Sequence, residues 1–167
     1  MNSLPPNAPG FSFKTRVTNA WANIELLRQA VIASARAVFD DETSVSIGTV
    51  ASELMENAVK YGVWTGASVH TMRVAVRGRE KVIEVEVEAP SSEEAATNLE
   101  RHLAWMRSFP SAEHAYQARI VELATSPADK RSSMGLVRIA VEGPCSIESE
   151  LTPDKLLIVR ALLVGGV

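Results

Sequence analysis

The sequence ASELMENAVKYG, residues 51–62, decides how the rest of the chain is interpreted. Together with the residues just before it, it predicts a helix whose apolar side chains recur every three or four positions, at Ile47, Val50, Ala51, Leu54, Ala58 and Tyr61. Glu53 and Asn57 are four residues apart and lie one turn apart on a shoulder of that apolar stripe, with Lys60 following on the same shoulder. Gly62 stands where a helix C-cap is expected. A carboxylate and an amide at the edge of a core are well placed to reach into a cleft.

Periodicity on either side of this helix predicts the remaining elements. Strands are expected at 11–13, 68–77, 82–88, 146–151 and 155–164, and helices at 18–39, 92–109, 111–124 and 135–141. Strands joined by short turns pair antiparallel, and helices grouped between them cover one face. The expected fold class is therefore α/β, a two-layer sandwich with a mostly antiparallel sheet. Residues 1–9 are expected to be a flexible tail, and residues 10–167 a single domain.

Two local patterns carry their own predictions. Glu84, Glu86 and Glu88 alternate with apolar residues, which indicates a strand with one solvated, acidic face. Ser91 and Glu94 have the spacing of a capping box and predict the start of the next helix.

The composition of the chain limits the classes of function that can be expected. The 167 residues carry a formal charge of −3, so electrostatics give no reason to expect nucleic acid as a partner. The most apolar segment, residues 156–164, is short and interrupted by Arg160, so we expect no membrane span and a cytoplasmic protein. The single cysteine, Cys145, excludes an internal disulfide. The three histidines, His70, His102 and His114, have no metal-ligand spacing with one another or with Cys145.

The stretch from Glu53 to Gly62 resembles the N-box of the GHKL ATPases, and most closely that of the small bacterial serine kinases that act as anti-sigma factors in partner-switching systems. The resemblance implies a Bergerat-type sandwich, which agrees with the fold class reached above. It also implies that Glu53 is the catalytic base on a hydroxyl or water. Asn57 would hold the Mg²⁺ carried by ATP, and Lys60 would belong to the same nucleotide site.

A second motif follows much later in the chain. Ser132, Ser133, Met134, Gly135 and Leu136 resemble the Gly-rich turn that opens a helix under the ATP phosphates, and Lys130 and Arg131 add positive charge just before it. An ordinary helix start with serine capping explains the same residues about as well.

A third motif of the family is absent. After the strand that ends near Glu88, the family has Asp-x-Gly-x-Gly on the adenine side, and here the chain reads Glu88-Ala89-Pro90-Ser91-Ser92. Glu88 could accept a hydrogen bond from an amine, but its place relative to the turn differs. The glycine-rich lid is also missing, and a helical insertion at about 91–126 stands in its place. The adenine side is therefore the weak part of the predicted ATP and Mg²⁺ site.

Three functional hypotheses follow. The first is an ATP- and Mg²⁺-dependent serine/threonine protein kinase that acts on an antagonist partner of the STAS type. The second is a non-catalytic switch protein that has lost ATP binding and holds a STAS-type or sigma-type partner with its helical insertion. In the third, the motif is a coincidence and Glu53 and Asn57 only border the core. Related kinases are commonly dimers, so a homodimer is an option, although no feature of the sequence requires a dimer interface.

Overall fold

The computed structural model of the 167-residue chain describes residues 10–16, 20–64, 71–79, 82–125, 134–142 and 145–164. The predicted tail, residues 1–9, lies outside this described part. The elements follow the predicted order: one strand, two helices, a pair of strands, three helices and a final pair of strands.

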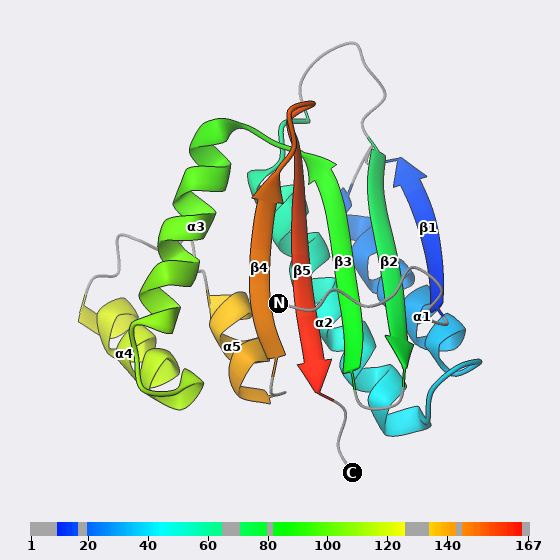
Figure 1. The fold of residues 1–167 in the computed structure, drawn as a ribbon, viewed down its shortest axis with the longest axis horizontal. Helices are drawn as coiled ribbons and strands as arrows, with labels where there is room; N and C mark the ends of the chain where they lie inside the picture. Colours follow the sequence, from blue (N-terminus) through cyan, green and yellow to red (C-terminus); the bar gives the residue numbers. More distant parts are fainter. Residues whose placement is uncertain are drawn as a thin grey trace.

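A five-stranded antiparallel sheet forms one layer of the fold (Figure 1). In order across the sheet, its strands are β1 (Gly10–Arg16), β2 (Thr71–Arg79), β3 (Val82–Pro90), β5 (Leu156–Val164) and β4 (Cys145–Leu151). The pairs β2–β3 and β4–β5 are neighbours along the chain, as predicted. β3 and β5 are far apart in the sequence, and their pairing, with Val87 opposite Val159, joins the two halves of the sheet.

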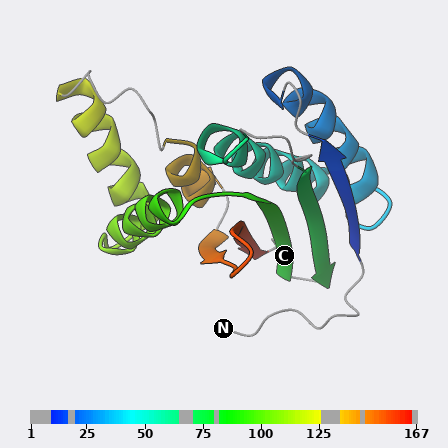
Figure 2. The same ribbon diagram turned by 90° about the horizontal axis from the view of Figure 1, so that it is seen from above.

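The helices lie on one side of this sheet and beyond one of its edges (Figure 2). α1 (Ala20–Ala35), α2 (Asp41–Tyr61) and α5 (Met134–Glu142) form the second layer. α3 (Glu93–Arg107) runs beside β4, and α4 (Ala112–Thr125) continues away from the sheet. The predicted two-layer α/β sandwich with helices on one face is thereby confirmed. Of the helices described, none combines the length and the apolar character needed to cross a membrane.

α2 forms where the sequence predicts it because both of its ends are capped and one stripe is apolar. Asp40 Oδ1 accepts the N–H of Thr43 at 2.8 Å, and the N–H of Gly62 donates to the carbonyl of Ala58 at 2.8 Å. The stripe is buried as predicted at Ile47, Val50, Ala51 and Leu54. Tyr61 was expected in the stripe but is exposed, because the last turn of α2 borders a cleft instead of the sheet.

The start of α3 differs from the prediction by one residue. The N–H of Ala95 donates to Ser92 Oγ at 3.1 Å, so Ser92 is the N-cap and the predicted capping box of Ser91 and Glu94 is wrong. Ser91 is held by its backbone instead, since its N–H donates to the carbonyl of Lys155 at 2.9 Å.

The predicted solvated face of β3 is also wrong. Glu84 and Glu86 point away from the helices but are only 4% and 3% exposed. Arginines of the two neighbouring strands cover them, because cross-strand neighbours place long side chains over one another. Arg77 pairs with Glu84, Arg73 pairs with Glu86, and Arg160 Nε donates to Glu86 Oε2 at 2.8 Å. Burial raises the pKa of Glu86, but the hydrogen bond from Arg160 and the charges of the three arginines hold it below its usual value.

Candidate functional site: a cleft between α2 and the helical insertion

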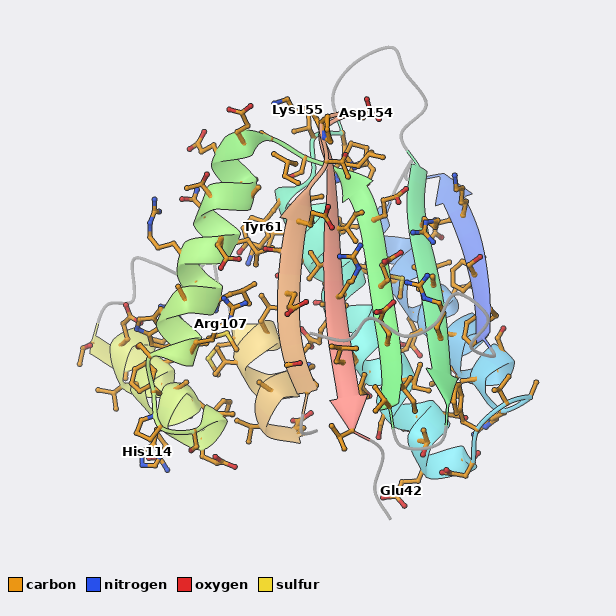
Figure 3. The ribbon with its side chains drawn as sticks, in the orientation of Figure 1. Glu42, Tyr61, Arg107, His114, Asp154 and Lys155 are labelled. Atoms are coloured by element: carbon orange, nitrogen blue, oxygen red, sulfur yellow. The ribbon has the colours of Figure 1, made fainter. Side chains whose placement is uncertain are left out.

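The cleft lies where the second half of α2 faces the helical insertion. Its volume is about 800 Å³, which is within the usual range for small-molecule sites. β3 and β5 contribute an apolar floor, and α2, α3, α4 and α5 contribute the walls. Tyr61, labelled in Figure 3, belongs to the α2 wall opposite α3.

Two of the predicted site residues on α2 line this cleft. Asn57 and Lys60 both lie in its wall. The side-chain amide of Asn57 donates to the carbonyl of Glu53 at 2.8 Å, so its nitrogen is engaged by its own helix. Lys60 Nζ lies 5.2 Å from the ring centroid of Tyr61, in cation–π range.

Glu53, predicted to be the catalytic base, is not among the residues that line the cleft. It is 7% exposed, and its Oε1 forms an ion pair with Arg138 of α5. Its Oε2 packs against Gly135, at the place where any Cβ on that residue would collide with it. Both carboxylate oxygens therefore face α5, and neither is directed at a substrate hydroxyl in the cleft.

The fold places the second predicted motif, at the start of α5, next to the first motif on α2. Met134, Gly135 and Leu136 form the first turn of α5, and Leu136 lines the cleft while Gly135 lies against Glu53. A side chain at position 135 would have to displace the carboxylate of Glu53. Lys130, Arg131, Ser132 and Ser133 lie outside the described residues.

The adenine side of the predicted site is apolar. Val87 and Ala89 of β3 face the cleft, whereas Glu88 alternates to the opposite face of the sheet, where its Oε2 lies 3.3 Å from Arg73. Glu88 therefore cannot accept a hydrogen bond from a ligand in the cleft. The carbonyl of Pro90 is already used, since it accepts the N–H of Val63 at 3.0 Å.

The outer wall of the cleft is fixed to the sheet. The guanidinium of Arg107, near the end of α3, donates to the carbonyl of Ile147 in β4 at 3.0 Å (Figure 3). At the other end of α3, Lys155 forms an ion pair with Glu93. Leu103, between these two anchors, is buried. α3 is therefore a wall of the cleft that is held at both ends.

Aromatic rings add a flat surface to this wall. The rings of His102 and Trp105 stack with centroids 5.5 Å apart, and Phe109 meets Trp105 edge-on at 4.9 Å. His102 and Trp105 line the cleft.

Two buried polar atoms in the cleft wall have no hydrogen-bond partner among the described residues. They are Nε of Arg119, on α4, and Oγ of Ser91, just before α3. Unsatisfied buried polar atoms are rare in folded proteins and mark places where a ligand or water completes the bonding. The analysis of the sequence did not single out Arg119. Its position four residues after buried Ala115, on the inner stripe of α4, is the signal that could have revealed it.

Arg138 was also missed by the sequence analysis. It lies three residues after Gly135, a spacing that turns its side chain back toward the start of α5. In the described part of the chain, no group of three or more His, Cys, Asp or Glu side chains is arranged to hold a metal ion.

A comparison with models of known protein families finds no match to this chain, and a comparison with curated proteins finds no significant match either.

Proposed function

We propose that this protein is a signalling regulator with the layout of a GHKL domain that acts by binding and not by phosphoryl transfer. The observation that carries the proposal is the state of Glu53. This carboxylate is buried, is paired with Arg138 and is turned away from the cleft. A base must come within hydrogen-bond distance of the proton that it accepts, whereas Glu53 directs Oε1 to Arg138 and Oε2 toward Gly135.

The resemblance to the partner-switching kinases supports the regulatory role and suggests the partner. Such a partner would be a small antagonist protein of the STAS type or a sigma factor. The helical insertion is the main departure from the family plan, and α4 presents Ile120 and Val121 to solvent. Exposed aliphatic side chains on a projecting helix are suited to contact another protein.

The second candidate is the serine/threonine kinase. It is favoured by Asn57, Lys60 and Leu136, which line one cleft beside the start of α5. Bound Mg²⁺–ATP would supply the phosphoryl group, Asn57 would hold the metal, and Lys60 would face the phosphates. The residues present fit this group only in part, because Glu88 points to the opposite face of the sheet and Glu53 is held by Arg138.

Nucleotide binding and transfer separate the two candidates. We would titrate the purified chain with ATP by calorimetry, with and without Mg²⁺, and then measure ADP release in the presence of a STAS-type protein. The binding proposal expects no transfer from wild type and none from Glu53→Gln. Asn57→Ala serves as the test of metal-dependent binding, since it should abolish any Mg²⁺-dependent component.

Transfer by the wild type that disappears in Glu53→Gln would overturn the binding proposal in favour of the kinase. Arg138→Met is measured beside Glu53→Gln, because it tests whether the ion pair keeps Glu53 from acting as a base. If the ion pair silences a competent base, this variant gains transfer, whereas a protein that only binds stays inactive.

A further inference from the structure

We propose that the cleft binds a small organic anion with a flat apolar body, and that Arg119 of α4 receives its anionic group. The inference rests on the proposed function, in which the cleft is a binding site, and it adds the chemical class of the ligand. It also places the charge of the ligand at the helical insertion and not at the start of α5.

Arg119 provides the first argument. It is 8% exposed, and one terminal nitrogen donates to Glu122 Oε2 at 2.6 Å. Its Nε has no partner among the described residues. Leaving a buried donor of a charged group unsatisfied costs more than leaving a neutral one, so an acceptor in the cleft would stabilise this side chain. The side chain of Glu122 is 53% exposed and lines the same cleft, so Arg119 and its carboxylate partner both belong to the cleft wall.

The balance of charge in the cleft provides the second argument. Among the described residues that line the cleft, the cations are Lys60, Arg101 and Arg119, and the carboxylates are Glu94 and Glu122. A cleft with apolar walls and an excess of positive charge favours anions, since the low-dielectric surroundings strengthen the attraction.

The shape of the cleft sets the size of the ligand. Its lining follows α3 from Ser92 to Trp105, which spans roughly 20 Å at about 1.5 Å per residue. Beside the polar side chains of Glu94, Asn98 and Arg101, the lining has aliphatic and aromatic contributions from Leu99, Leu136, Leu157, Val159 and Trp105. An inorganic anion would leave this surface unused, whereas a planar ring system would bury against it.

Ser91 supplies a second polar contact. Its Oγ is buried, with the residue 6% exposed, and has no partner among the described residues. A hydroxyl both donates and accepts, so it suits a polar substituent on the ligand body.

The test uses a matched pair of probes, 1-naphthoate and 1-naphthamide, which share the ring and differ in charge. Their affinities for the purified full-length chain are measured by NMR titration. We expect wild type to prefer the acid by roughly tenfold or more, since hydrogen bonds to charged groups contribute about 1.5–3 kcal/mol. The acid should also shift the Nε–H resonance of Arg119, and the amide should not.

Arg119→Met should bind the two probes equally, with the affinity for the amide unchanged. Arg101→Met is the control. Arg101 lines the same cleft and adds to its positive charge, but it is exposed and donates to Asn98 of its own helix at 2.7 Å, so its loss should reduce the preference for the acid much less than Arg119→Met does. If Arg119→Met does not fold, the shift of the wild-type resonance still decides the question.

Equal affinity for the two probes in wild type, or a preference for the acid that survives in Arg119→Met, would overturn the proposal. Failure of both probes to bind would overturn it as well. None of these three results would contradict the proposed function, which is refuted separately if the protein transfers a phosphoryl group.

Discussion

Replacement of Arg138 by methionine tests how Glu53 is held. The substitution keeps most of the apolar volume of the side chain and removes the guanidinium, so that a carboxylate only 7% exposed loses its ion pair. Breaking a fully buried pair by removing one partner costs about 3–5 kcal/mol, whereas exposed pairs contribute about 0–1 kcal/mol. The Arg138 side chain is 46% exposed, so water can partly replace it. We therefore expect a loss of about 1–2 kcal/mol.

The measurement is urea unfolding followed by circular dichroism, for wild type, Arg138→Met, Glu53→Gln and the double variant. The expected loss of stability comes from leaving the buried carboxylate of Glu53 without its ion pair. Arg138→Met should therefore hardly change the stability of the Glu53→Gln variant, which has no charge at this position. The matched control is Arg101→Met. The exposed side chain of Arg101 donates to Asn98 of its own helix, and its loss should change stability by less than about 0.5 kcal/mol. Equal costs of Arg138→Met in both backgrounds would refute the reasoning, since the loss would then come from packing and not from the charge of Glu53.

Three further predictions follow from single contacts. Ser92→Ala should lower the free energy of unfolding by about 1 kcal/mol because it removes the N-cap of α3. Ser91→Ala should be nearly neutral because the Oγ of Ser91 has no hydrogen-bond partner among the described residues. Equal effects of the two substitutions in urea unfolding would contradict the assignment of Ser92 as the cap. The lowered pKa of Glu86 predicts a contribution to stability that is present above its unfolded pKa, near 4.5, and is lost as the pH falls through the lower folded value. Glu86→Gln should therefore show a smaller acid loss than wild type between pH 5 and about pH 3, and identical pH profiles would count against the arginine cover. Burial raises the pKa of the Cys145 thiol to about 11, so little reactive thiolate is present at pH 8. A disulfide reagent should therefore label Cys145 slowly in the folded protein and quickly in urea. Rapid labelling of the folded chain would be inconsistent with that burial.

Much of the fold could be predicted because its signals are local. The order and approximate bounds of the strands and helices follow from periodicity, and the C-cap of α2 follows from Gly62. The pairing of β3 with β5 has no local signal, since it joins strands that are far apart in the chain. The burial of Glu84 and Glu86 could not be predicted for the same reason. It depends on arginines that only the sheet brings alongside.

The candidate site was predictable in its location more than in its chemistry. The spacing on α2 puts Asn57 and Lys60 on one shoulder of the helix, and both line the cleft. The same spacing put Glu53 on their shoulder, but the rotamer of a side chain depends on what packs against it, and Arg138 turns the carboxylate toward α5. Arg119 belongs to the site only because α3 and α4 are folded back beside α2, which is a tertiary arrangement.

The attachment of α3 to β4 has a consequence for how this protein associates with other chains. β4 is one of the two edges of the sheet, and an open edge invites another strand to pair with it. Arg107 occupies the carbonyl of Ile147, and Ser149 Oγ donates to Glu100 at 3.2 Å, so α3 obstructs strand addition on that side. A chain that extends this sheet by β-augmentation would have to do so along β1, at the opposite edge.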